Sequence, residues 1–197
     1  MPHYYSEEQT SDLRINKINI NVKNVSFPLF SGSGVFSKKR LDKGTEVLLK
    51  GMQIKDNSKV LDLGCGIGVV GIYVNKQFPS AEVTLSDVNR RAFLLTRKNL
   101  ALNNVEAKTV NCDGFAKIKE TFDTVLFNPP QVAGKETCFR LFQEAYEHLN
   151  KDGTLQIVAR HNKGGKSYSE KMKEIFGNVE EIHKGSGYRV YLSQKKS

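Results

Sequence analysis

The 197-residue sequence has few of the residues that build disulfides, metal sites or membrane spans. Its three cysteines, Cys65, Cys112 and Cys138, are widely spaced, form no C-x-x-C pair and have no histidine at metal-ligand spacing. The four histidines show no ligand-like spacing either. No long apolar run could span a membrane, and the first twenty residues are polar rather than signal-like. We therefore expect a cytoplasmic protein with no disulfide, no metal site and no membrane partner.

Acidic residues are scarce relative to basic ones. Thirty Lys and Arg against 21 Asp and Glu leave a formal net charge of +9 and a pI near 9.4. This balance favours a polyanionic partner, because each phosphate that a cation neutralises releases condensed counterions. A lysine-rich, well solvated surface explains the charge equally well. The basic clusters are Lys38, Lys39 and Arg40; Arg90, Arg91, Arg97 and Lys98; and Arg160, Lys163 and Lys166.

Short apolar runs alternate with helical patterns after residue 50. The runs that read as strands are 59–63, 82–86, 107–111, 122–127, 154–160, 179–183 and 187–193. The helical patterns are 69–77, 89–102, 135–149 and 167–176. Because parallel strands need crossover connections, this alternation predicts an α/β sheet with helices on both faces. Only KGSG separates the last two strands, which predicts an antiparallel C-terminal hairpin.

The first fifty residues have a different texture. Ile18, Ile20 and Val22 alternate with polar residues, which is strand periodicity, and a short helix fits residues 42–50. We therefore expect residues 1–50 to form a strand, loop and helix extension packed on a main domain of residues 51–197.

A glycine-rich turn follows the first strand of the main domain, in the stretch VLDLGCGIGVVG. Gly64, Gly66 and Gly68 let the backbone pass close to a ligand, and the next helix presents its N-terminal N–H groups at the same place. Gly66, Gly68 and Gly71 match the G-x-G-x-x-G spacing of dinucleotide sites. The register argues against such a site, because counting from the strand end at Gly64 puts Val69 where the third glycine belongs.

Acidic residues stand at the ends of the first two strands of the main domain. Asp62 is poorly placed for a pyrophosphate but well placed for the cationic amino-acid part of S-adenosylmethionine. Asp87 closes the second strand, where a carboxylate accepts both hydroxyls of a ribose. Each acid alone could be a solvated strand-end residue or a helix N-cap. The order of strand, acid, glycine turn, second strand and second acid favours an S-adenosylmethionine site.

The stretch LFNPP places a carboxamide and two prolines at the end of an apolar strand. Proline fixes φ and has no backbone donor, so the segment cannot continue as a central strand. The side chain of Asn128 and the carbonyls of Asn128 and Pro129 are therefore available as acceptors. A Pro129-Pro130 turn that merely ends the strand is the simpler alternative, but it does not explain the asparagine before it.

These motifs resemble the class I S-adenosylmethionine-dependent methyltransferases, and within them the small-domain methyltransferases related to ribosomal RNA guanine methyltransferases. The resemblance covers nearly the whole chain. It is carried by GVFS at 34–37, DKGTEVLL at 42–49, VLDLGCGIGVVGI at 60–72, SDVNRRA at 86–92, NCDGF at 111–115 and FNPP at 127–130. It implies a Rossmann-like, mostly parallel seven-stranded sheet, with the methyl donor across the carboxyl ends of its first strands.

The resemblance also implies roles for individual residues. The donor-binding set is Asp62, Gly64, Gly66, Gly68, Asp87, Asp113, Phe36 and Ser37. In this set Asp113 would reach the adenine amino group, while Phe36 and Ser37 would cover the donor. An N-cap at Asp113 and a hydrophobic plug at Phe36 remain alternatives. The catalytic set is Asn128, Pro129 and Pro130.

The NPP motif suits methylation of an exocyclic amino group on a base. Such a nitrogen is a poor nucleophile, because its lone pair is delocalised into the ring. If Asn128 and the Pro129 carbonyl accept its hydrogen bonds, they direct the lone pair at the methyl group and favour the positive charge that develops on nitrogen. Related adenine and glutamine methyltransferases usually carry a stacking aromatic after the second proline. Here that residue is Gln131, so stacking would come from Phe36 or Phe139, or Gln131 would read a base edge.

We therefore expect S-adenosylmethionine-dependent methylation of an exocyclic amino group in RNA, with the guanine 2-amino group of ribosomal RNA as first choice. The partner would be ribosomal RNA or a ribosomal particle. The alternatives are methylation of a protein glutamine amide, and a non-catalytic module that binds the donor or RNA.

Overall fold

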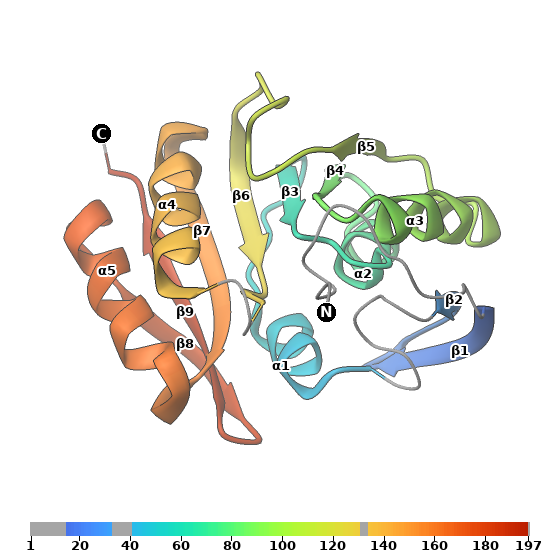
Figure 1. Ribbon diagram of the computed structural model, residues 1–197, viewed down its shortest axis with the longest axis horizontal. Helices are drawn as coiled ribbons and strands as arrows, with labels where there is room; N and C mark the ends of the chain where they lie inside the picture. The colour runs from blue at the N-terminus through green and yellow to red at the C-terminus, as the bar shows by residue number, and fades with distance from the viewer. Residues whose placement is uncertain (1–14, 33–40, 131–133, 197) are drawn as a thin grey trace.

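The computed structural model describes residues 15–32, 41–130 and 134–196, and a seven-stranded sheet forms its centre (Figure 1). The strands are β3 (Lys59–Leu63), β4 (Glu82–Asp87), β5 (Lys108–Asn111), β6 (Phe122–Phe127), β7 (Leu149–Arg160), β8 (Glu180–Gly185) and β9 (Tyr188–Gln194). Their order is β5-β4-β3-β6-β7-β9-β8. Strands β3 to β7 run parallel, and β9 is antiparallel to both β7 and β8. This confirms the predicted sheet and its C-terminal hairpin.

Helices cover both faces of the sheet, as the alternating pattern predicted. They are α1 (Lys43–Gly51), α2 (Val69–Gln77), α3 (Arg90–Leu102), α4 (Gly134–Glu147) and α5 (Lys166–Phe176). Alternate side chains of β3 enter separate cores. Val60 belongs to the core with α1, α2 and α3, whereas Leu61 belongs to the core with α4 and α5. No helix of the described residues is both long and apolar enough to cross a membrane.

The N-terminal segment with alternating apolar residues belongs to a hairpin of two strands rather than to a single strand. Strands β1 (Ile15–Val22) and β2 (Val25–Gly32) form a separate antiparallel hairpin, with Lys23 at positive φ in its turn. The open edge of β2 is paired by a side chain of α3. The Asn99 carboxamide accepts the backbone N–H of Phe30 at 2.6 Å and donates to the Phe30 carbonyl at 2.9 Å. The hairpin therefore packs on α3, while a domain boundary at residue 50 remains a prediction.

Strand β7 begins earlier than its apolar pattern indicates, at Leu149 instead of residue 154. Leu149 pairs with Phe122 before the register shifts, and Asp152 within the irregular stretch has a positive φ of 63°. Helix α4 accordingly ends at Glu147, two residues before its predicted end. The polar residues between Leu149 and Thr154 hide this pairing from a periodicity argument, because an irregular ladder has no period of two.

The chain reverses direction between β3 and β6. From β3 it proceeds through α2 to β4 and through α3 to β5, and it then returns so that β6 lies on the other side of β3. At such a reversal, neighbouring strands send their following loops to opposite faces and leave a crevice at their carboxyl ends. The fold therefore places the glycine turn after β3 and the NPP segment after β6 beside one another.

Candidate active site

A cavity of about 290 Å³ lies at the carboxyl ends of the parallel strands. Its lining comes from seven parts of the chain: Asp42 and Thr45; Asp62 to Ile67 with Val69 and Val70; Ser86 to Asn89 with Ala92; Cys112 and Gly114; Phe127 to Pro130; Leu141; and Tyr188. The volume is close to the lower end of the range for small-molecule sites. Of the predicted site residues within the described part of the chain, all but Gly68 and Asp113 line this cavity.

The glycine turn forms one wall of the cavity. Gly64, Gly66 and Gly68 all have positive φ, at 66°, 58° and 86°. A Cβ at Gly66 would meet nothing within 4 Å, so its backbone borders open space. Gly68 directly precedes α2, whose first N–H groups follow it. The turn therefore lets a ligand come close to its backbone, and only glycine adopts this backbone without strain.

Asp62 and Asp87 are carboxylates on the same wall, Asp62 buried and Asp87 half-buried. Asp62 is 3% exposed, and its Oδ2 accepts the N–H of Gly71 at 2.9 Å. Asp87 accepts the N–H of Gly66 at 2.8 Å through Oδ2 and that of Asn89 at 2.7 Å through Oδ1. The alternative of Asp87 as the cap of α3 is wrong, because the Asn89 side chain accepts the first N–H groups of that helix. Asp87 instead ties the second strand to the glycine turn.

Burial shifts the titration of both acids. It raises the pKa of Asp62 to about 7, although the Gly71 hydrogen bond acts in the opposite direction and the Asp87 charge adds to the rise. It raises the pKa of Asp87 to about 6, against the hydrogen bonds from Asn89 and Gly66. Two acids whose pKa values are raised in this way favour a cationic ligand, because a positive charge would offset the cost of ionising them.

We expect the Asp62→Asn variant to change how stability depends on pH. The folded pKa of Asp62 lies above the usual 3.8, so the folded protein holds the proton more tightly than the unfolded chain between these values. The free energy of unfolding of the wild type should therefore fall as pH rises from about 4 to about 7, relative to the variant. One pKa unit is about 1.4 kcal/mol, so the difference should change by roughly 2–4 kcal/mol.

Urea denaturation of both proteins without ligand at several pH values measures this difference. A constant difference across the range would show that Asp62 is already ionised in the folded protein at pH 4.

Asn128 borders the cavity at the end of β6. Its Nδ2 donates to Thr45 Oγ1 at 3.0 Å and lies 3.4 Å from Asp42 Oδ2. An ionised carboxylate can only accept, so the amide nitrogen must face Asp42. The carboxamide oxygen of Asn128 makes no hydrogen bond within the residues that the structure describes. It is available as an acceptor, and its role at a target amine remains a prediction.

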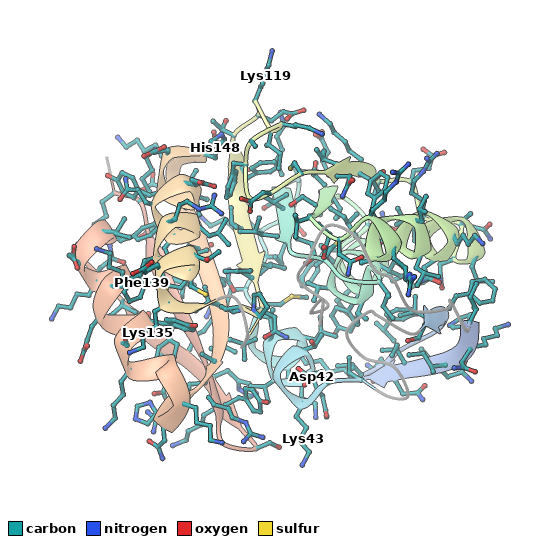
Figure 2. The ribbon with its side chains drawn as sticks, viewed as in Figure 1. Asp42, Lys43, Lys119, Lys135, Phe139 and His148 are labelled. Carbon is teal, nitrogen blue, oxygen red and sulfur yellow. The ribbon has the colours of Figure 1, made fainter. Side chains whose placement is uncertain are left out.

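Sequence reasoning passed over three residues of the cavity. Asp42 and Thr45 belong to the DKGT stretch, whose pattern indicated the start of a helix rather than a site. Figure 2 shows Asp42 at the start of α1, with the Lys43 side chain directed away from the molecule. Tyr188 is an aromatic side chain of the lining, brought to the cavity edge because β9 pairs with the end of β7. A tyrosine after a hairpin turn carries no signal of a site in the sequence.

Several predicted residues do not reach the described cavity. Asp113 lies outside the lining, and both of its carboxylate oxygens accept from Arg140 Nη2 at 2.9 Å. Its contact with adenine remains a prediction. Phe139 packs against Tyr168 of α5 rather than at the cavity (Figure 2). Phe36, Ser37 and Gln131 lie outside the described residues. Within those residues, no group of three or more His, Cys, Asp or Glu side chains could hold a metal ion.

The cavity fits S-adenosylmethionine by its own chemistry. The glycine turn leaves open space for a close backbone approach. Asp62 and Asp87 suit a cationic amino-acid part and a ribose. In addition, the Ser86 hydroxyl is 1% exposed, lines the cavity and has no hydrogen-bond partner within the described residues. A buried hydroxyl of this kind is costly unless a ligand pairs with it.

Comparison with known proteins identifies the family. The family model for the methyltransferase small domain matches residues 26–192. A Bacillus subtilis protein, YbxB, is 33% identical over 197 residues and covers 98% of each chain. The ribosomal RNA small subunit methyltransferase C of Haemophilus influenzae is 36% identical over 167 residues, which are 83% of this chain and 50% of that protein. The chain thus spans about half the length of these ribosomal RNA methyltransferases.

Solved structures share the fold. The T. thermophilus 16S rRNA N2 methyltransferase, in complex with AdoMet and guanosine, superposes with a TM-score of 0.83 at 22% identity and covers 96% of this chain and 52% of that one. A methyltransferase from Pyrococcus furiosus superposes with a TM-score of 0.68 at 24% identity and covers 77% of this chain and 81% of that one. Together with the donor-type cavity, the family match shows that the chain belongs to the methyltransferase small domain family and is an S-adenosylmethionine-dependent methyltransferase.

Proposed function

We propose that this protein methylates an exocyclic amino group of a base in RNA, with the guanine 2-amino group of ribosomal RNA as the preferred target. The observation that carries the proposal is the orientation of Asn128. Its amide nitrogen is engaged by Asp42 and Thr45, so its oxygen is the atom available to an incoming N–H donor. An amino nitrogen carries such donors, whereas a ring nitrogen lone pair or a carbonyl oxygen does not.

The residues of the NPP segment would act by positioning. S-Adenosylmethionine supplies the electrophilic methyl group when it is bound. One N–H of the target amine would donate to Asn128 Oδ1 and the other to the Pro129 carbonyl, which turns the nitrogen lone pair out of conjugation and towards the donor. Both acceptors stabilise the positive charge that nitrogen gains as the carbon–nitrogen bond forms, before a proton leaves the nitrogen. Pro130 keeps the segment from joining the sheet.

RNA as the substrate is supported by the placement of basic residues and by the relatives. Arg90 follows the end of β4, Arg160 is the last residue of β7, and Lys163 and Lys166 come shortly after it. Both groups therefore stand at the carboxyl ends of the strands, where the cavity lies. The side chains of all four are exposed. Relatives at 36% identity are ribosomal RNA methyltransferases, and the T. thermophilus structure holds guanosine. The Lys38–Arg40 cluster lies outside the described residues.

The deciding experiment uses purified protein, labelled S-adenosylmethionine and total RNA from a strain that lacks the gene, followed by nucleoside analysis. We expect the label in guanosine methylated on its 2-amino group. Label in methylated adenosine would correct the base and retain the mechanism. If label enters protein glutamine alone when total protein is offered, the glutamine alternative replaces RNA, and absence of transfer to either would leave a non-catalytic module.

We expect the exposed basic residues after β7 to contribute to RNA affinity. The Lys163→Glu, Lys166→Glu double variant should bind the same RNA more weakly at each salt concentration. Its log-log salt slope should be smaller by about one for each phosphate that the variant no longer neutralises. The base that is modified should not change, because backbone contacts position the RNA and base contacts specify it.

A control with the same change of charge uses two lysines at the amino ends of the strands, opposite the cavity. Lys55 precedes β3 and Lys119 precedes β6, and Figure 2 shows Lys119 at the far end of the molecule from Asp42. The Lys55→Glu, Lys119→Glu protein should keep the wild-type slope. Equal weakening in both double variants would assign the effect to net charge rather than to this surface.

A further inference from the structure

We propose that Asp42 and Thr45 are positioning residues for methyl transfer, which hold the Asn128 carboxamide in the one orientation that accepts a substrate amine. The inference rests on the proposed function, because it concerns the same site. It assigns a role to the start of α1, which precedes Asn128 by some eighty residues in the chain but contacts it in the folded protein.

The three side chains form a closed set of contacts. Asn128 Nδ2 lies 3.0 Å from Thr45 Oγ1 and 3.4 Å from Asp42 Oδ2. Thr45 Oγ1 is in turn 3.5 Å from the same Asp42 oxygen. Asp42 is also the N-cap of α1, because this oxygen accepts the backbone N–H of Thr45 at 3.0 Å. The carboxylate is therefore held by the helix that it caps.

The protons of this set can be arranged in one way only. Carboxylate oxygens accept hydrogen bonds, and Asp42 Oδ2 accepts from both neighbours. The Thr45 hydroxyl accepts from Asn128 and directs its own proton to Asp42. A carboxamide rotated by half a turn would bring its oxygen towards the carboxylate and leave its nitrogen without these acceptors, which costs free energy. Asn128 Oδ1 is thus directed away from α1.

Packing behind the pair keeps it in place. Thr45 is 6% exposed, and Gly44 beside it is buried as well. A Cβ at Gly44 would come within 2.9 Å of Asp42 Oδ2 and 3.0 Å of the Tyr188 ring. The Tyr188 ring and the carboxylate therefore approach the helix backbone closely, and the absence of a side chain at Gly44 permits this approach. Thr45 is thus enclosed, and the half-buried Asp42 lies against the helix backbone that it caps.

Substitutions of Thr45 can distinguish the positioning of Asn128 from the capping of the helix. The cap uses the Asp42 side chain and the backbone N–H of Thr45, and it does not need the Thr45 hydroxyl. Thr45→Val removes the hydroxyl with little change of volume, whereas Thr45→Ser retains it. The pair of variants therefore tests the contact to Asn128 while the helix start is kept.

The experiment measures single-turnover methylation of total RNA from the deletion strain, with S-adenosylhomocysteine affinity and thermal stability alongside. We expect Thr45→Val to slow methylation roughly five- to twentyfold, the effect that corresponds to one hydrogen bond, at unchanged S-adenosylhomocysteine affinity. Thr45→Ser should stay within about twofold of the wild-type rate. In an Asn128→Ala background, Thr45→Val should slow the reaction no further, because its partner is already absent.

A wild-type rate in Thr45→Val, or the same fold-loss in both backgrounds, would overturn the inference. Should Thr45→Val fold poorly, Asp42→Ser provides the second test, since serine still caps the helix but carries no carboxylate. It should be slowed in the wild-type background and not in the Asn128→Ala background, and any other result overturns the inference. An Asn128→Ala protein that is itself fully active would remove the proposed function, whereas an inactive one beside a fully active Thr45→Val removes this inference alone.

Discussion

The Asn128→Ala enzyme should transfer methyl groups about two to three orders of magnitude more slowly than the wild type, at nearly unchanged donor affinity. Asn128 lines the cavity with its oxygen unpaired within the described residues, so alanine removes an oriented acceptor for the target amine. The acceptor matters most as positive charge develops on nitrogen, and its removal therefore raises the barrier rather than weakening ground-state binding. Single-turnover transfer from labelled donor to total RNA of the deletion strain measures the effect.

A second asparagine provides the control. The amide nitrogen of Asn150 also donates a hydrogen bond to an aspartate, Asp123, at 2.8 Å. Asn150 lies near the start of β7, at the end of the strands away from the cavity. Asn150→Ala should lose stability without a change in the transfer rate once folded. If Asn128→Ala transfers methyl groups at the wild-type rate, the NPP segment is only a turn.

The Asp87→Ala protein should bind the donor more weakly by roughly 1–3 kcal/mol, the range for removing a hydrogen-bond partner that carries a charge. The carboxylate has two tasks at once. It lines the cavity where the ribose hydroxyls are expected, and it accepts the N–H of Gly66, which keeps the glycine turn against the second strand. Alanine removes both, so the effect should exceed that of a peripheral contact.

Calorimetry with S-adenosylhomocysteine measures this effect, and Glu82→Ala is the matched control. Glu82 is an exposed acid at the other end of the same strand, so its removal should leave donor affinity within error of the wild type. Calorimetry with NADH tests the cofactor itself. Binding of NADH in the absence of any binding of S-adenosylmethionine or S-adenosylhomocysteine would contradict the donor site.

Much of the fold follows from local patterns. The strands β3, β4 and β6 begin and end within one residue of their predicted limits, because each is a short apolar run that stops at or just before an acid, a glycine or the Asn-Pro-Pro segment. The glycine turn and the NPP segment could also be recognised, because glycine permits a close approach of the backbone to a ligand and because two prolines end a strand. The parts that escaped the pattern are irregular: the early start of β7 and the second strand of the N-terminal hairpin.

Residue types at short spacing were enough to predict the α/β class and the methyl donor, and they are also the basis for proposing the Asn128 side chain as an acceptor. The surroundings of that acceptor depend instead on how distant segments pack. Asp42 and Thr45 meet Asn128 from more than eighty residues away, and Tyr188 arrives through the antiparallel pairing of β9. Packing likewise sets Asp113 against Arg140 and places Phe139 between α4 and α5. Contacts of this kind follow from the order of strands and the packing of helices, and such long-range geometry leaves no periodic trace in the chain.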